Sequence, residues 1–377
     1  MSGIYIHIPF CKQACHYCDF HFSTSMGKKE TMVNALCKEI EMRKNEFIGE
    51  TVETIYFGGG TPSVLQTCEI EQLLHTVREH YTVIANPEIT LEANPDDLSE
   101  EKILQLAASP INRLSIGIQS FFEEDLRLMN RAHNAQEAEK CLQLAKQYFN
   151  NISIDLIYGM PNMSVARWKE NIDKALHYDI PHISSYALTV EPKTALAKFV
   201  EEGLIIPASD EETQAHFNLL NKTLLNAGYD CYEISNFGKP GYYSKNNSAY
   251  WQQKKYIGIG PSAHSFDGVR RGWNVNNNPK YMKSINAGML PIEEEILSTT
   301  DRYNEYIMTG LRTIWGVSMD RIKSDFGEKY KEYALLQAEK YITEHLLFFD
   351  GDVLKTTQKG MFLADGIASN LFMVNLK

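Results

Sequence analysis

The sequence lacks the features that mark a secreted, membrane-bound or nucleic-acid-binding protein. Its 377 residues contain no apolar run of membrane-spanning length, and a strand-like segment begins by residue 4, which leaves no room for a signal peptide. Acidic residues outnumber basic ones by 48 to 37, and the net charge of −11 argues against non-specific binding to nucleic acid. We therefore expect a cytoplasmic protein with no membrane span and no nucleic-acid partner.

A disulfide framework is not expected either. The chain has seven cysteines, an odd number, and four of them are scattered along it: Cys37, Cys68, Cys141 and Cys231. Regularly spaced, even-numbered cysteines are typical of disulfide-rich secreted domains, whereas this distribution favours a reducing cytosol.

The other three cysteines lie in one short loop. Cys11, Cys15 and Cys18 follow the apolar run Ile4–Ile8 with the spacing Cys-x3-Cys-x2-Cys. Thiolate is the usual protein ligand of [4Fe-4S] clusters, and three thiolates leave one iron free to bind a small molecule. Nearby histidines make a Cys3His zinc site the alternative, although the chain has no second Cys-x2-Cys pair of the kind that zinc knuckles use. On the spacing alone, both readings stay open.

Strand-like and helix-like segments alternate through the first two thirds of the chain. The expected strands are Ile4–Ile8, Glu53–Phe57, Glu88–Glu92, Arg113–Ile118, Ile152–Ile157, His182–Leu188 and Asp230–Ile234. The expected helices lie near Lys28–Phe47, Glu69–Tyr81, Glu100–Ala108, Ala135–Phe149, Val165–His177 and Asp210–Ala227, with Ser25, Ser99, Ser164 and Ser209 as candidate N-caps. Repeated strand–helix units predict a parallel sheet with right-handed crossovers, either a TIM-type barrel or an open doubly wound sheet.

The placement of unusual residues favours a partial TIM-type (β/α)6 barrel. Each strand ends in residues that a plain loop would not need: the cysteine loop, the turn Gly58–Pro62, Glu92, Gln119, Asp155 and Ala187. Chemistry collected at the carboxyl ends of successive parallel strands is the TIM-barrel arrangement, whereas an open sheet concentrates it in one crevice.

Three parts of the chain are expected. Residues 1–240 form the barrel, and residues 241–297, which are rich in Asn, Gly and Tyr with little periodicity, form an irregular extension that packs on it. Residues 298–377 combine three helical patterns with a turn at Asp350–Asp352, which predicts a small winged-helix-like α+β domain. That domain has no concentrated basic stripe, so we expect a packing or partner-docking role for it.

Several residues at the strand ends suggest ligand binding. Consecutive glycines after the second strand allow the backbone to approach a ligand closely, although a tight turn would also explain them. Glu92 and Asp155 are acidic residues within apolar strands, where an unpaired charge is expensive to bury, so we expect them to face a polar ligand or a cation. Gln119 and Arg131 add polar contacts, although Arg131 taken alone is better explained as a surface helix charge.

Five motifs together resemble the radical S-adenosylmethionine (SAM) family. They are Tyr5–Cys18, Gly58–Pro62, Leu91–Pro95, Ser115–Phe121 and Ile154–Pro161, in the family's order and at compatible spacing. Within the family they resemble the branch of oxygen-independent coproporphyrinogen III oxidases and HemW-type heme chaperones. The resemblance extends from residue 3 to about residue 265, and the C-terminal part is similar to the chaperones' C-terminal domain.

The resemblance implies a role for each matching residue. Cys11, Cys15 and Cys18 would hold a [4Fe-4S] cluster, and SAM would bind its fourth iron. A first SAM site would be lined by Tyr5, Gly59, Glu92 and His264. The positions that bind a second SAM in the oxidase correspond here to Tyr17, Gly60, Thr61, Gln119, Arg131, Asp155 and Ala187.

Two departures from the oxidase favour a heme chaperone. The oxidase has a further cysteine where this chain has Phe20, and it has a long N-terminal extension that this chain lacks. The resemblance therefore implies heme as ligand, an acceptor protein that receives the heme, and an electron donor for the cluster. The runner-up is the oxidase itself, and a third reading is a barrel that keeps a cluster only for structure.

The expected heme-binding residues are Asn246, Asn247, Tyr250 and Trp251, which match the family motif His-Asn-x-x-Tyr-Trp. Its first position is Asn246 here, and an amide is a poor ligand for heme iron beside imidazole, thiolate or thioether. His264 could substitute for the missing histidine, or aromatic stacking and propionate contacts could hold the heme without it.

Overall fold

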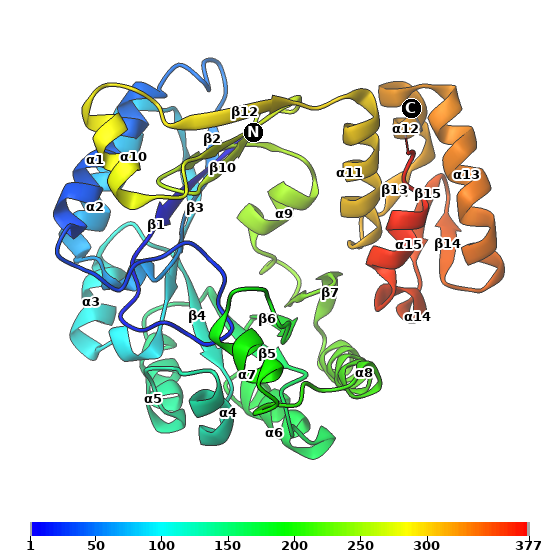
Figure 1. Cartoon of the computed structure of the whole chain (residues 1–377), viewed down its shortest axis with the longest axis horizontal. Coiled ribbons are helices and arrows are strands. Elements are labelled where there is room, and N and C mark those ends of the chain that lie inside the picture. Colours follow the sequence, from blue (N-terminus) through cyan, green and yellow to red (C-terminus); the bar gives the residue numbers. More distant parts are fainter. Residues whose placement is uncertain (1, 375–377) are drawn as a thin grey trace.

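The computed structural model describes residues 2–374 and shows a large α/β body with a smaller domain at its side (Figure 1). The body begins with six strands, each followed by helices, and the helices lie along the outer face of the strands. The strands are β1 (Ser2–Ile8), β2 (Val52–Gly59), β3 (Val83–Ala93), β4 (Arg113–Gln119), β5 (Ile152–Tyr158) and β6 (His182–Ala187). The helices are α1 (Lys29–Met42), α2 (Thr67–His80), α3 (Glu100–Ala108), α4 (Glu123–Leu128), α5 (Ala135–Ala145), α6 (Val165–His177), α7 (Ala195–Glu201) and α8 (Asp210–Asn226), with short 3-10 turns at Pro62–Val64 and Pro95–Asp97.

The six strands are parallel neighbours in chain order, which confirms the prediction of a partial TIM-type (β/α)6 barrel. The sheet does not close on itself. Beyond β6 it continues into the antiparallel strands β8 (Asn236–Gly238) and β7 (Asp230–Glu233), and beyond β1 it continues into β9 (Lys255–Ile259).

A period-2 alternation in the strands separates a polar interior from an apolar exterior. In β1, Ile4, Ile6 and Ile8 are buried in the core against the helices, whereas Tyr5 and His7 lie on the opposite face. The same parity places Glu92 in β3 and Asp155 in β5 on the inner face. The barrel therefore encloses a polar lumen instead of a packed apolar core.

Two helices and one cap differ from the sequence-based expectations. Helices α4 and α7 are six and seven residues long, too short to produce a clear helical periodicity. Ser99, Ser164 and Ser209 cap their helices as predicted, but Ser25 does not, because α1 begins at Lys29.

The stretch 241–297, expected to be irregular, is built of regular elements. It contains α9 (Lys245–Trp251), β9, β10 (His264–Phe266), β11 (Arg270–Asn274), α10 (Asn278–Asn286) and β12 (Ile292–Ile296). Strand β9 pairs in parallel with β1, and β10 to β12 extend the sheet in antiparallel order. Elements this short carry little periodicity of their own, and their pairing with the barrel stabilises them.

A buried ion pair fastens this stretch to the barrel. Glu39 on α1 and Arg43, the residue directly after α1, are 0% and 2% exposed, and their side chains contact each other at 3.3 Å. The Arg43 guanidinium donates to the Gly258 carbonyl and to Ser265. The Glu39 carboxylate accepts hydrogen bonds from Gly260, Asn274 and Tyr281, so four separate elements converge on one pair.

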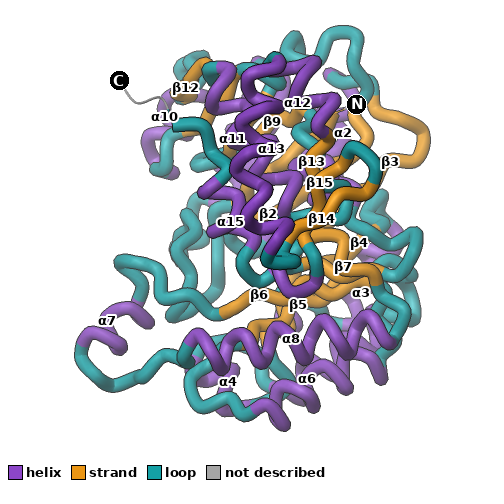
Figure 2. Tube along the Cα trace, turned by 90° about the vertical axis from the view of Figure 1, so that its right-hand side faces the viewer, coloured by secondary structure: helices purple, strands orange, loops and turns teal. Residues whose placement is uncertain are grey.

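The C-terminal domain has its own hydrophobic core, which includes Tyr303, Ile307, Val317, Ile322 and Leu354. Its elements are α11 (Thr299–Leu311), β13 (Val317–Ser318), α12 (Met319–Phe326), α13 (Glu328–Thr343), β14 (Leu347–Asp350), β15 (Val353–Thr356), α14 (Gln358–Met361) and α15 (Ala364–Asn370). Its helices lie in front of the barrel strands in Figure 2, and Gly351 makes the β14–β15 turn. The domain boundaries at residues 240 and 297 stay a prediction. Within residues 2–374, no helix is long and apolar enough to cross a membrane.

We predict that Arg43→Met destabilises the protein by about 3–5 kcal/mol, because the substitution leaves Glu39 as an uncompensated buried charge. Urea unfolding followed by circular dichroism measures the effect. The control is Lys44→Met at the neighbouring exposed position, which should change the midpoint little. An unchanged midpoint for Arg43→Met would show that the pair does not hold the extension in place.

Candidate functional site

The cysteine loop lies at the carboxyl end of β1 and is fixed from several sides. The Cys11 amide donates to the Ser23 carbonyl, which closes the base of the loop. The His16 amide donates to the Met129 carbonyl, and Asn130 exchanges side-chain hydrogen bonds with Gln13 and Ala14. The helix α4 and the segment after it therefore hold the loop against the barrel mouth.

Each of the three sulfur atoms has a hydrogen-bond donor directed at it. The Thr61 hydroxyl donates to Cys11 Sγ at 3.3 Å, and Arg131 Nη1 donates to Cys15 Sγ at 3.3 Å. The Phe20 amide donates to the Cys18 sulfur. Burial raises the pKa of Cys11 and of Cys18 to about 11, so the free thiols would stay protonated, whereas bound iron would favour thiolates. Donors aimed at sulfur fit a thiolate-bound cluster with a negative charge.

The two histidines of the zinc alternative point to other partners. His16 Nδ1 contacts the Leu128 carbonyl at 2.9 Å, and His21 Nε2 contacts the Asn278 side chain at 2.7 Å. Among residues 2–374, no three His, Cys, Asp or Glu side chains converge as ligands of a single metal ion.

The glycine turn after β2 is required by the protein's own packing. A Cβ atom on Gly59, whose φ is +106°, would lie 2.5 Å from the His7 ring. A Cβ atom on Gly60 would lie 2.6 Å from the Phe10 carbonyl at the start of the cysteine loop. Close approach of the turn to the loop therefore explains these glycines, with or without a ligand.

Two carboxylates face the lumen above the barrel floor. Glu92 accepts hydrogen bonds from the Tyr56 hydroxyl at 2.7 Å and from the Gly59 amide at 3.2 Å. Burial, followed by the nearby Asp155 charge, raises the pKa of Glu92 to about 7, and burial raises the pKa of Asp155 to about 6. Groups with such raised pKa values are available to bind a cation or to exchange a proton near neutral pH.

The other predicted cofactor residues surround the same lumen. Tyr5 stacks on Tyr56 with ring centroids 6.1 Å apart. Tyr17 lies close enough to Arg131 and Asp155 for their charges to affect its pKa, which burial raises. Gln119 ends β4 with a left-handed φ of +65°, an uncommon conformation for a residue other than glycine. Ala187 ends β6 opposite Tyr158. All these positions were predicted from sequence, and their roles stay predictions.

The sequence reasoning missed three residues of the lumen. Arg113 begins β4 and is 2% exposed, with Nη2 3.4 Å from His182 Nδ1. Tyr56 binds Glu92, and Asn94 accepts from Arg131 Nη2 at 2.5 Å. The sequence did contain a signal for Arg113 and Tyr56. Side chains alternate between the two faces of a strand, and both residues occupy positions on the face that points into the lumen.

The expected heme residues lie on or near α9, which closes the amino end of the barrel. Asn246 is 4% exposed and accepts a hydrogen bond from Thr54 at 2.8 Å, and it also hydrogen-bonds the Tyr250 hydroxyl. Asn247 donates to the Tyr232 hydroxyl at 3.4 Å, and the Arg312 guanidinium lies 5.1 Å from the centre of the Trp251 ring. Asn246 therefore points into the barrel and is not available to a ligand outside it.

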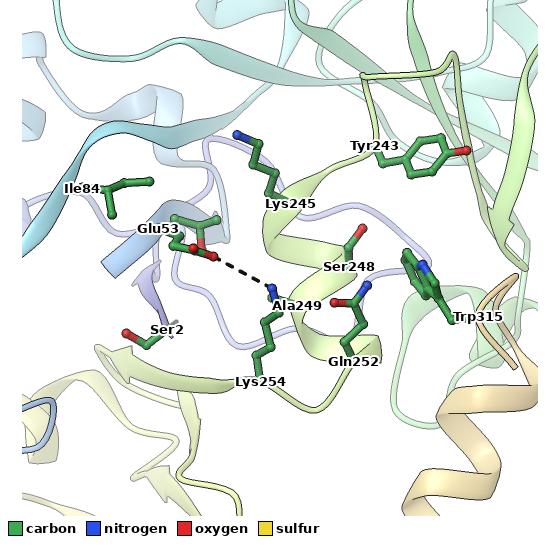
Figure 3. Close-up of a pocket in the computed structure, with 11 residues that line it drawn as sticks. Ser2, Glu53, Ile84, Tyr243, Lys245, Ser248, Ala249, Gln252, Lys254 and Trp315 are labelled. Atoms are coloured by element: carbon green, nitrogen blue, oxygen red, sulfur yellow. Dashed lines mark ion pairs between the residues drawn. The ribbon is translucent and has the colours of Figure 1, made fainter. Parts of the chain in front are cut away.

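His264 lies beside Gly258 of β9, the residue that pairs with Tyr5 of β1. It begins β10, opposite Trp273 of β11, and its side chain is exposed. It does not line the cleft beside α9, whose surface includes Ser248, Tyr243 and Trp315 (Figure 3).

We predict that Glu92→Gln stabilises the cofactor-free protein at pH 8 and has little effect at pH 5. The folded-state pKa of about 7 lies above the unfolded value of about 4.3, so the wild-type carboxyl costs stability as the pH rises through this window. The gain at pH 8 is expected to reach about 4 kcal/mol at most, since one pKa unit corresponds to about 1.4 kcal/mol. Thermal unfolding at both pH values tests this, with the exposed Glu71→Gln as control. Equal effects at pH 5 and pH 8 would refute it.

Comparison with known proteins places this site in a family. Residues 5–190 match the Radical SAM superfamily, and residues 297–363 match the HemN C-terminal domain. The heme chaperone HemW of Lactococcus lactis is 34% identical over 368 residues, which cover 97% of this chain and 96% of the relative. HemW of Bacillus subtilis is 35% identical over 336 residues, covering 88% of this chain and 87% of the relative.

A solved structure supports the fold. The coproporphyrinogen III oxidase of Escherichia coli, described as a radical SAM enzyme, superposes with a TM-score of 0.85 at 22% identity and covers 99% of this chain and 90% of its own. With sequence identity above 30% over nearly the whole length of the HemW relatives, and with the cysteine loop at the mouth of a partial barrel, this chain belongs to the radical SAM superfamily and, within it, to the HemW family.

Proposed function

We propose that this protein is a heme chaperone, which binds heme and transfers it to an acceptor protein. The observation that carries the proposal is the near full-length similarity to proteins named heme chaperone HemW. The acceptor and the electron donor are expected to be separate proteins. A cytoplasmic location fits a cluster that depends on three reduced thiolates.

Membership of the radical SAM superfamily implies a [4Fe-4S] cluster and SAM. Cys11, Cys15 and Cys18 would hold the cluster, and the donors on Thr61 and Arg131 would stabilise its negative charge. When bound, the reduced cluster can supply an electron that cleaves SAM. Tyr5, Gly59, Glu92 and His264 are proposed for the first SAM. A second SAM, if the chaperone retains that site, would contact Tyr17, Gly60, Thr61, Gln119, Arg131, Asp155 and Ala187.

The heme iron ligand is proposed to come from a residue other than Asn246. This side chain already pairs with Thr54, and leaving that hydroxyl buried and unpaired would cost free energy. His264 is a candidate from the sequence, although it does not line the cleft beside α9. We assign contacts to heme chiefly to the outer surface of α9 and to the residues around it.

The alternative function is oxidative decarboxylation of coproporphyrinogen III, as in the oxidase with the same fold. A shared fold does not decide between the two, because related sites on one fold support different activities. The departure that disfavours the oxidase is Phe20. It is 68% exposed in the cysteine loop, at the position where the oxidase has a further cysteine.

We predict that anaerobic reconstitution gives about one [4Fe-4S] cluster per chain, because the loop supplies three thiolates. Replacing Cys11, Cys15 or Cys18 by Ala should remove the cluster absorbance and bound iron. Cys68→Ala, at an exposed position away from the loop, is the control and should keep both. Stoichiometric zinc without iron in the reconstituted wild-type protein would contradict the prediction.

We also predict heme binding without turnover of coproporphyrinogen III. Decarboxylation needs the substrate side chain positioned at the reacting SAM, and a misplacement of about 1 Å can cost 100-fold in rate. Heme titration followed by the Soret band, beside an anaerobic assay with SAM and a reductant, separates the two functions. Formation of protoporphyrinogen IX would favour the oxidase, and the absence of heme binding would remove the chaperone proposal.

A further inference from the structure

A cleft runs across the amino ends of the barrel strands, on the opposite side of α9 from the lumen. It consists of two adjoining pockets of about 390 Å³ each, and Tyr243 and Lys245 line both of them. Volumes of this size are typical of sites for small organic ligands. We call this surface the amino-end cleft, and Figure 3 shows the more apolar of its two pockets.

The two pockets differ in chemistry. The first pocket is bounded by Ile84, Ala249, Tyr243 and Trp315, and the last of these comes from the segment after α11 in the C-terminal domain. The second pocket is lined mainly by polar groups, among them Arg78, Asn86, Asn112 and Asn151. A ligand that fills both pockets would be apolar at one end and polar at the other.

The unpaired charges of the amino-end cleft are positive. Arg78 and Lys245 are exposed, and among residues 2–374 neither side chain has a hydrogen-bond or ion-pair partner. The cleft's two carboxylates are engaged: Glu88 accepts from the backbone amides of Lys245 and Asn246, and Glu53 lies 3.9 Å from Lys254. In a protein with a net charge of −11, two free cations beside one pocket favour an anionic ligand.

We propose that the amino-end cleft is the heme site, with the porphyrin ring against Tyr243 and Trp315 and the propionates at Lys245 and Arg78. This inference rests on the proposed chaperone function, and it identifies where and how the heme is held. Heme combines a flat apolar ring with two carboxylates on one edge, and so matches both pockets. Lys245 lies at their junction, where the ring edge would meet the polar half.

The proposed site is separate from the cysteine loop. Strand β1 runs from Ser2, which lines the cleft, to Ile8, which precedes the cysteine loop, a rise of about 20 Å. Helix α9 lies between the two sites, with Asn246 toward the lumen and Ser248 and Ala249 toward the cleft. A heme in the cleft would thus be open to solvent between the barrel and the C-terminal domain, as transfer to an acceptor requires.

The test compares heme with its dimethyl ester, in which the propionate charges are masked. Affinities for both are measured by titration with the full-length wild-type protein, Lys245→Ala, Arg78→Ala and the double variant. For heme, each single variant should bind about tenfold more weakly than wild type. Esterification should weaken binding to the wild type but have no further effect on the double variant, because the groups that recognise the charges are gone.

Two controls keep the result specific. Lys222→Ala removes an exposed cation from α8, outside the cleft, and should bind heme like the wild type. Lys245→Arg should restore most of the affinity, since it keeps the charge. The substituted side chains are exposed, so the melting temperatures of the variants should not change. A loss of heme affinity at an unchanged melting temperature would therefore show that the substituted residue contributes to heme binding.

The outcomes separate this inference from the function on which it rests. If the wild type binds heme but the Lys245 and Arg78 variants bind it equally well, the amino-end cleft is not the propionate site, while the chaperone proposal stands. If the wild type binds no heme, the chaperone proposal itself fails. If the ester binds the wild type as tightly as heme does, the propionates are not recognised and the assignment is wrong.

Discussion

The structure depends on one constraint: the inner face of a barrel of parallel strands is polar, and each polar group there needs a partner within the enclosed space. The outer faces of the strands form the hydrophobic core, where residues such as Ile6, Phe57 and Leu91 pack against the helices. The inner faces carry Tyr5, Glu92 and the other lumen residues. Burial without a partner would cost each of these groups free energy, so their hydrogen bonds fix the geometry of the lumen.

The buried charged groups of the lumen lower the stability of the folded protein. Glu92 and Asp155 are held near each other in a buried setting that disfavours their charged forms, although Tyr56 and Ser184 donate hydrogen bonds to them. The Arg113 guanidinium lies deep in the same lumen, and its Nε has no partner among the described residues. Such groups are expected where a ligand supplies the missing interactions. In the pair of Glu39 and Arg43, by contrast, hydrogen bonds from and to neighbouring segments compensate for the burial of the two charges.

Helix α9 gives the fold two separate functional surfaces. Its inward residues complete the lumen through Thr54, and its amino end is held by the Glu88 carboxylate. Its outward residues form a wall of the amino-end cleft together with Trp315. Related sites on one fold can support different activities, so the barrel alone does not define the reaction.

The sequence by itself determined the strand–helix order, the cysteine loop and the family, because these depend on local patterns: period-2 alternation, helix caps and the spacing of short motifs. It also indicated that Glu92 and Asp155 point away from the apolar core, because a charged residue within an apolar strand would cost free energy if it faced that core. Only the tertiary structure decided that Asn246 points inward, that Arg113 lies in the lumen, and that residues 241–297 extend the sheet. These features depend on contacts between segments far apart in the chain, such as Asn246 with Thr54 and Trp315 beside α9, and no local pattern specifies them.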